Sequence, residues 1–311
     1  MKPLFILGGI NKQRWACAVA ARARDLAISM ISPGLPLLDV ALAVEGFIKN
    51  EGCSVAFPMN IAIGDIAAHY TPAYNDATVF KKGDVVKIDV GAHLKGYIGD
   101  TARSMEVGTK DNHALIKASE KALDEAIAMI RPGADLGEVG AVIESVIRSK
   151  GFRPIRNLAG HSVERYNLHG AITVPNTKDK MLGVVRSGDV LAIEPFATTG
   201  KGKVEEGEEG SIYNFIAKKR YSRQDANMLQ HIILTRNDWR YLPFCQRMCI
   251  NEVTGMGPSQ VEVALKQLVR AGGIYPFKVL KEVSGAPVAQ TEHTVLVTKQ
   301  GAEVLTINKE M

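Results

Sequence analysis

The chain has 311 residues, of which 46% are hydrophobic and 23% are charged, a composition that is ordinary for a globular protein. Its net charge of +5 is too mild and too dispersed to favour nucleic-acid binding, and no window of the sequence approaches a membrane span. The four cysteines are too few for a disulfide framework, so we expect reduced thiols in a cytoplasmic protein.

Two parts of the chain repeat each other. Residues 23–34 (ARDLAISMISPG) match residues 122–133 (ALDEAIAMIRPG), and residues 83–89 (GDVVKID) match residues 188–194 (GDVLAIE). Each copy predicts a helix that ends at Pro-Gly, a second amphipathic helix and then a strand, because apolar residues recur at helical steps before the β-rich motif. The chain is therefore predicted to hold two related α+β halves packed about a pseudo-twofold axis.

Residues 83–107 predict a β-hairpin that carries two aspartates. A two-residue turn at Leu94 and Lys95 would place Asp89 directly opposite Asp100, whereas a turn one residue later would make the aspartates diagonal neighbours on the same face. Like charges directly opposite destabilise a sheet unless a hard divalent ion takes oxygens from both. The alternative interpretation is a pair of solvated aspartates on an edge hairpin.

Three further residues extend this candidate metal site. Glu194 ends the repeat of the strand motif that Asp89 ends in the first half, so a pseudo-twofold axis would bring the two carboxylates together. Glu292 lies in an alternating, buried strand pattern over residues 288–297, where a charged side chain needs a partner or a metal. His161 is a candidate nitrogen ligand, although a lone histidine is more often structural. Such dispersed oxygen-rich ligands suit two ions that catalyse hydrolysis.

These residues resemble the methionine aminopeptidases of the pita-bread fold. Residues 67–72 (AAHYTP) and 160–170 are similar to the two histidine motifs of the type 2 class, and residues 290–294 (QTEHT) are similar to its closing glutamate motif. The resemblance covers nearly the whole chain. It implies five metal ligands, which fall in the family's order: Asp89, Asp100, His161, Glu194 and Glu292.

The gap between the last two of these ligands holds helical material, such as residues 259–268, that the repeat does not explain. This segment resembles the helical subdomain that type 2 enzymes contain and type 1 enzymes lack. The chain also lacks the long charged N-terminal extension of eukaryotic type 2 enzymes, so it resembles the archaeal form. The resemblance implies a pita-bread catalytic domain over residues 1–199 and 274–311 and an inserted helical subdomain over residues 200–273.

The resemblance also implies a role for each ligand. Asp89 would bind one metal ion, Asp100 and Glu292 would bridge two, and His161 with Glu194 would hold the other. Glu194 would also be the general base, which takes a proton from the hydrolytic water and passes it to the leaving amine. The implied cofactors are two divalent ions of cobalt, manganese, iron or zinc.

Outside the ligand set, two histidines and three apolar residues match family positions that contact substrate. His69 would form a hydrogen bond near the scissile nitrogen, and His169 would form one near the carbonyl oxygen. Phe57, Leu168 and Phe196 would line the methionine pocket, although each could equally be a core residue.

The implied activity is removal of the initiator methionine from nascent proteins whose second residue is small. We expect N-terminal methionyl peptides and nascent chains as partners, with the ribosome as a further candidate, and we expect a monomer with no membrane and no direct nucleic-acid contact. One alternative is an Xaa-Pro dipeptidase or aminopeptidase, which shares the fold and ligands but usually has a separate N-terminal domain. The other is a metal-free binding homologue, which would have lost some of the ligands.

Overall fold

The computed structural model describes residues 8–179, 183–250 and 255–308. Each half of the chain begins with the predicted pair of helices. They are α1 (Gly9–Met30) and α2 (Leu37–Asn50) in the first half, and α3 (His113–Met129) and α4 (Leu136–Ser149) in the second. The Pro-Gly pairs separate the two helices of each half, because proline cannot continue a helix and Gly34 and Gly133 adopt φ angles of 86° and 87°. The predicted helical repeat is confirmed.

The strands that follow each helix pair form separate antiparallel sheets. In the first half the order is β1-β3-β4, from β1 (Ser54–Ile63), β3 (Val85–Leu94) and β4 (Tyr97–Glu106). In the second half the order is β15-β14-β8-β6-β7, from β6 (Ala159–Ser162), β7 (Thr173–Pro175), β8 (Val190–Ile193), β14 (His293–Thr298) and β15 (Gly301–Val304). A small sheet of order β13-β9-β5 contains β5 (Arg153–Pro154), β9 (Phe196–Thr198) and β13 (Val288–Gln290).

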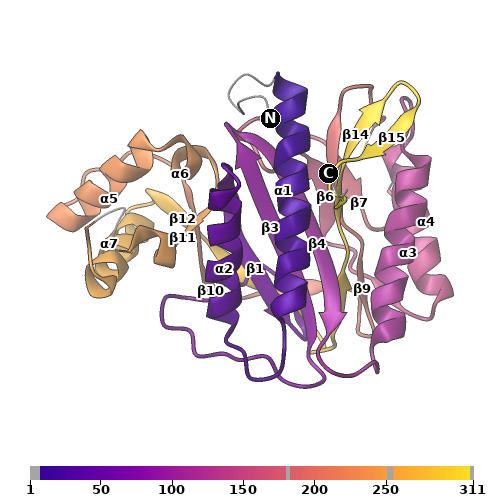
Figure 1. Cartoon of the computed structure of the whole chain (residues 1–311), viewed down its shortest axis with the longest axis horizontal. Coiled ribbons are helices and arrows are strands. Elements are labelled where there is room, and N and C mark those ends of the chain that lie inside the picture. The colour runs from indigo at the N-terminus through magenta and orange to yellow at the C-terminus, as the bar shows by residue number, and fades with distance from the viewer. Residues whose placement is uncertain (1–7, 180–182, 251–254, 309–311) are drawn as a thin grey trace.

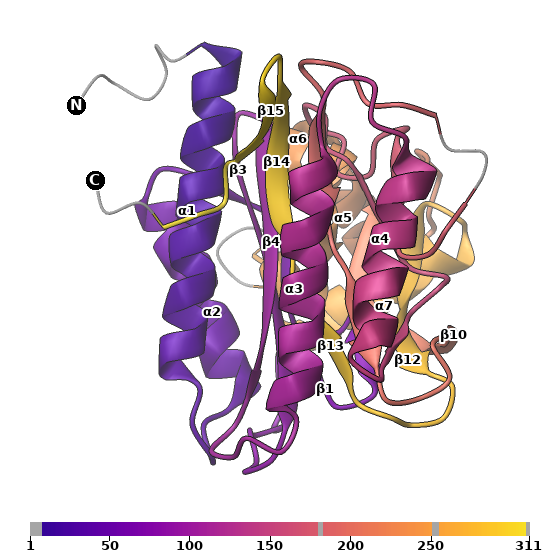
Figure 2. The same ribbon diagram turned by 90° about the vertical axis from the view of Figure 1, so that its right-hand side faces the viewer.

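The helix pairs cover the outer faces of these sheets. Helix α1 lies on β3 and β4, and α3 with α4 lies on the strands of the second half (Figure 1). Figure 2 shows the two helix pairs side by side, each beside its own strands. Alanines and one glycine allow the close approach of α1, since a Cβ at Gly99 would lie 2.4 Å from the Cα of Cys17. The two largest clusters of buried apolar side chains lie one in each half, which matches the predicted duplication.

The hairpin of β3 and β4 forms as predicted, but the predicted turn at Leu94 and Lys95 is wrong by one residue. The turn consists of Lys95 and Gly96, whose φ angles of 53° and 86° are those of a tight hairpin turn. Asp89 therefore lies opposite Ala102 and diagonal to Asp100. The aspartates still share one face, which is the alternative that the sequence left open.

Side-chain hydroxyl groups join β4 to the C-terminal segment of the second half. Ser104 bonds both the N–H and the carbonyl of Gln290 at 2.7 Å. Thr294 does the same with Asp100, at 2.9 Å from its N–H and 2.7 Å from its carbonyl. Thr101 donates to the main-chain carbonyl of Glu292 at 2.8 Å. We call Thr101, Ser104 and Thr294 the hydroxyl seam, since they connect two sheets that share no continuous ladder.

The predicted insert contains a long strand as well as helices. Strand β10 (Val204–Phe215) pairs with β12 (Ile274–Glu282), in a sheet of order β11-β10-β12-β2 that also contains β11 (Phe244–Cys245) and β2 (Ile66–Ala68). The helical elements are α5 (Gln224–Thr235), α6 (Asn237–Tyr241), the 3₁₀ turn η2 (Gln246–Cys249) and α7 (Pro258–Arg270). They enclose their own apolar core and lie beside the two repeated halves (Figure 1). The domain boundaries remain predictions.

Two expectations from composition can be compared with the structure. No helix among the described residues is long and apolar enough to cross a membrane. The four cysteines are buried, and none forms a disulfide within the part of the chain that the structure describes. Burial raises the pKa of Cys53 to about 12 and that of Cys245 to about 11, so these thiols stay protonated at neutral pH.

Candidate active site

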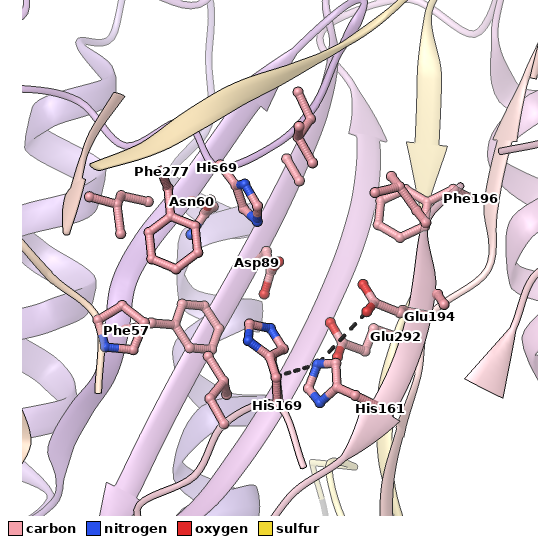
Figure 3. Close-up of a pocket in the computed structure, with 18 residues that line it drawn as sticks. Phe57, Asn60, His69, Asp89, His161, His169, Glu194, Phe196, Phe277 and Glu292 are labelled. Atoms are coloured by element: carbon pink, nitrogen blue, oxygen red, sulfur yellow. Dashed lines mark ion pairs between the residues drawn. The ribbon is translucent and has the colours of Figure 1, made fainter. Parts of the chain in front are cut away.

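All five predicted ligands line one cavity of about 160 Å³ between the two halves (Figure 3). Strands β3 and β4 carry the two aspartates, and β6 carries the histidine. One glutamate directly follows β8, and the other lies between β13 and β14. The predicted duplication therefore brings carboxylates from both halves to one place. The side chains are those of Asp89, Asp100, His161, Glu194 and Glu292.

Three of the ligands form a tight group. One candidate ligand atom each of Asp100, His161 and Glu292 lies within 4.8 Å of the other two. His161 Nε2 also lies 3.8 Å from an oxygen of Asp100 and 3.8 Å from an oxygen of Glu194. Asp89 faces this group across the cavity in Figure 3. Asp100, His161 and Glu292 thus form a compact centre. The carboxylates of Asp89 and Glu194 lie on either side of it.

The electrostatics of the four carboxylates favour a bound cation. Burial raises the pKa of Asp89 to about 7, and burial together with the neighbouring carboxylates raises the pKa values of Asp100, Glu194 and Glu292 well above their ordinary range. The Oδ1 atoms of Asp89 and Asp100 are buried and have no hydrogen-bond partner among the described residues. Buried carboxylates of this kind are satisfied by divalent cations with oxygen ligands, so these residues fit a metal site.

Backbone contacts fix the proton positions of two histidines. Nδ1 of His161 lies 3.2 Å from the carbonyl of Ser162, and Nδ1 of His69 lies 3.2 Å from the carbonyl of Lys278. A carbonyl only accepts, so Nδ1 is the donor in both rings and Nε2 keeps its lone pair. Burial lowers the pKa of His161 to about 4 and also lowers that of His69, so both rings are neutral near pH 7.

The third histidine of the cavity, His169, lies beside His161 with the ring centroids 4.4 Å apart. Burial, with a further contribution from the neighbouring histidines, lowers its pKa to about 3. It therefore offers a neutral N–H donor at neutral pH. Both histidines that were predicted outside the ligand set line the cavity with the five ligands.

Aromatic and aliphatic side chains form an apolar wall of the cavity. The predicted pocket residues Phe57, Leu168 and Phe196 all line it. Sequence reasoning missed Ile212 and Phe277, because they come from β10, within the insert, and from β12, directly after it, and neither strand carries a local motif. Both are strand residues in a sheet that reaches the first half through β2, which only the long-range pairing reveals.

Two polar residues at the site were also missed. Gln290 Nε2 donates to Glu194 at 3.2 Å and so orients that carboxylate. Asn60 lines the cavity and is paired with Asp89 across β1 and β3. A signal for Gln290 was present, since an amide two residues before the closing glutamate lies on the same face of an extended segment.

Comparisons with known proteins agree with this geometry. The model of metallopeptidase family M24 matches residues 11–299. The chain is similar to the methionine aminopeptidase of Methanocaldococcus jannaschii, with 42% identity over 96% of this chain and 98% of the relative. Among solved structures it is similar to the methionine aminopeptidase of Thermotoga maritima (27% identity, TM-score 0.69, 96% of each chain). It shares the fold of a thermophilic Arx1 (16% identity, TM-score 0.82, 97% of this chain and 91% of the other).

Proposed function

The chain belongs to metallopeptidase family M24 and, within it, to the archaeal methionine aminopeptidases, and we propose that its five clustered ligands bind two divalent metal ions for this hydrolysis. The proposed reaction removes the initiator methionine from peptides and nascent proteins whose second residue is small. The observation that carries the proposal is the group of four carboxylates, two buried and two half-buried, with one neutral histidine around a single cavity.

In this proposal each ligand has a distinct place. Asp89 would hold one ion, His161 with Glu194 would hold the other, and Asp100 and Glu292 would contribute to holding both. His161 suits this role because its Nδ1 donates to a backbone carbonyl, which orients the free Nε2. When bound, the metal ions would polarise the scissile carbonyl and lower the pKa of the hydrolytic water.

Glu194 is the proposed general base. Its raised pKa allows its carboxylate to accept a proton from the hydrolytic water and then to donate that proton to the leaving amine. The hydrogen bond from Gln290 to one of its oxygens fixes the orientation of the carboxylate. The proton therefore has a defined carrier within the cavity.

His69 and His169 are proposed to bind the reacting amide from two sides. His69 Nε2 is an acceptor, so it can take the hydrogen bond of the scissile N–H. His169 is neutral and has an N–H, so it can donate to the carbonyl oxygen on which negative charge develops. Phe57, Leu168 and Phe196 would then surround the methionine side chain.

Hydrolysis of Met-Ala-Ser and of Ala-Pro, with manganese or cobalt added to the purified protein, tests this proposal. We expect release of methionine from the first peptide and little cleavage of the second. Preferential cleavage of the proline peptide would instead indicate an Xaa-Pro peptidase. Metal analysis of the purified protein separates either enzyme from a metal-free binding protein, for which no stoichiometric metal would be found.

Three further features remain predictions. They are ribosome association, a monomeric state and a cytoplasmic location. Sedimentation of the protein with ribosomes, and alone, would test the first two.

A further inference from the structure

Arg247 lies in η2, within the inserted segment, but its side chain contacts the first half of the molecule. Its guanidinium group is 4% exposed and forms an ion pair with Glu45 of α2, whose side chain is 6% exposed. Arginine and glutamate side chains are almost never fully buried unless they are paired, as these two are, although Nε of Arg247 has no hydrogen-bond partner among the described residues. This arginine is therefore the strongest candidate for a link between the insert and the catalytic halves.

Two more hydrogen bonds extend from the same guanidinium group. Nη1 donates to the hydroxyl of Thr71 and to the carbonyl of Pro72, both at 2.7 Å. Thr71 in turn donates to the carbonyl of Met59 at 2.7 Å, and Glu45 accepts from the N–H of Met59 at 3.1 Å. We call these five residues the Arg247 network. It holds residues 71–72 against β1 from the outside of the cavity.

The segment held by this network also carries His69, two residues before Thr71. His69 has a φ angle of 64°, which is unusual for a residue other than glycine. Such a conformation persists only where the surrounding contacts over-determine it. The pairing of Ala68 with Leu280 and the edge contact of the His69 ring with Phe277 hold the start of the segment. Its later part is held by a hydrogen bond from the N–H of Ile61 to the carbonyl of Tyr70, by the bond of the Tyr70 hydroxyl to Asp76 and by the Arg247 network.

A second part of the network, Met59 on β1, also lies next to the cavity. Met59 precedes Asn60, which lines the cavity and lies opposite Asp89 in the pairing of β1 with β3. A shift of the strand at Met59 would therefore move a group beside the ligands. The network therefore joins both segments: Thr71 bonds Met59 directly, and the guanidinium group bonds Thr71 and also Glu45, which in turn bonds Met59.

We propose that Arg247 is a positioning residue for the hydrolysis: it holds residues 69–72 so that His69 presents Nε2 to the substrate. This inference rests on the proposed function, because it uses the proposed role of His69. It makes the insert a part of the catalytic apparatus, since a residue between its helices fixes a histidine in the cavity of the two halves.

A purely structural role would have different consequences. If Arg247 only fastened the insert to the first half, its replacement would lower stability, and activity would fall only as folded protein was lost. A positioning residue affects turnover in protein that is folded and fully loaded with metal, since a displacement of about 1 Å can reduce a rate by about a hundredfold.

Arg247→Lys is the first test, in the manganese-loaded enzyme with a methionyl peptide. Lysine keeps the charge beside Glu45 but lacks the planar fork that reaches three acceptors at once. We expect kcat to fall between about tenfold and a hundredfold, with KM and metal content little changed. The matched control is Leu229→Ala, which opens a cavity in the core of the insert and removes none of the hydrogen bonds of the network. It should lower the melting temperature while kcat changes less than about twofold.

A double-mutant cycle with His69→Ala makes the test specific. If Arg247 acts through His69, Arg247→Lys should reduce kcat in the normal background and have almost no further effect in the His69→Ala background. Equal factors in both backgrounds, or an unchanged kcat for Arg247→Lys alone, would overturn the inference. An unchanged rate for His69→Ala alone would instead reject the proposed role of His69, so the two failures are distinguishable.

Thr71→Val is the second variant, in case Arg247→Lys does not fold. It removes the acceptor nearest to His69 and leaves the ion pair with Glu45 in place. We expect the same fall in kcat at unchanged metal content and the same absence of effect in the His69→Ala background. A normal kcat in this variant would contradict the inference.

Discussion

The two halves of the molecule present their candidate ligands in different ways. The first half uses one regular hairpin, whose strands β3 and β4 have ten residues each and carry both aspartates. The second half uses short strands, with four residues each in β6 and β8, and gives its histidine and glutamate from separate segments. The closing glutamate lies in neither repeated motif, but in the segment that the hydroxyl seam connects to β4.

This difference shows how a duplicated fold can hold an asymmetric site. A long hairpin fixes two carboxylates by its own pairing, so the first half holds both aspartates in set relative positions. The second half supplies one glutamate and a neutral imidazole, whose positions depend on contacts between segments. The position of the second half relative to the hairpin of β3 and β4 then depends on the hydroxyl seam. The predictions below test this division from the largest expected effect to the smallest.

Replacement of a ligand on the hairpin should have the largest effect. We expect Asp100→Ala to abolish stoichiometric metal binding and to lower activity by at least about a thousandfold, because a carboxylate shared by two ions is lost. Glu194→Gln in the second half should also abolish turnover but keep part of the bound metal, because an amide oxygen can still act as a ligand. Metal analysis and peptide hydrolysis measure both quantities, and a fully metallated, active Asp100→Ala enzyme would contradict the bridging role.

The hydroxyl seam should contribute strongly to stability. Thr294→Val keeps the shape of the side chain but leaves the buried N–H and carbonyl of Asp100 without their partner. At about 1 to 3 kcal/mol for each unsatisfied group, we expect the free energy of unfolding to fall by about 2 to 4 kcal/mol. The control is Thr298→Val on the same strand, whose hydroxyl donates to the carbonyl of Gly301 and accepts from the N–H of Gln300, both within the second half. Equal denaturation midpoints for the two variants would show that the hydroxyl of Thr294 in the seam contributes no more to stability than the hydroxyl of Thr298.

The affinity for metal should depend on pH through the carboxylates and not through the histidine. The raised pKa values mean that the metal-free carboxylates hold protons near neutral pH, and a bound cation must displace them. Because the pKa of Asp89 is about 7, affinity should fall at least about tenfold, or about 1.4 kcal/mol, between pH 8 and pH 6. His161 is already neutral in this range.

Titration calorimetry of the metal-free protein can separate these contributions. Asp89→Asn should reduce the number of protons released on metal binding, because the pKa of Asp89 is about 7. His161→Gln should weaken binding without changing that number. A proton release that depended on His161 would reverse the assignment.

The smallest effect is expected where the halves meet at the surface. Arg14 of α1 and Glu303 of β15 form an ion pair at 2.8 Å, but their side chains are 45% and 33% exposed. Exposed pairs contribute between zero and about 1 kcal/mol and are screened by salt. Glu303→Gln should therefore change the unfolding free energy by less than about 1 kcal/mol at low salt and by less at high salt. A larger loss would mean that the surface, and not the seam, holds the halves together.

Sequence reasoning succeeded where the pattern was local or repeated. The helix pairs, the hairpin and the duplicated acidic strand ends could all be recognised from residue spacing. The register of the hairpin could not, because Leu94 is drawn into the core at 6% exposure and shifts the turn to the next two residues. The pair Lys95-Gly96 is not a strong turn signal in the sequence. The burial of Leu94 therefore determined which two residues form the turn.

The parts of the cavity that were missed share one physical cause. Phe277 and Ile212 reach the cavity only because β10 and β12 pair across the insert and continue to β2. The ion pair of Arg247 with Glu45 likewise joins residues that are 202 positions apart. Contacts at such separations follow from the complete fold and leave no periodic trace in the sequence.

The Arg247 network also has a thermodynamic consequence. If the insert holds the His69 segment, linkage requires the reverse: a substrate analogue that orders His69 must favour the docked state of η2 by the same free energy. Backbone amides of η2 should then exchange their hydrogens more slowly when an inhibitor occupies the cavity, although the inhibitor does not touch them. By the same linkage, a molecule that bound the outer helices and favoured the undocked state of η2 would lower the affinity for the inhibitor.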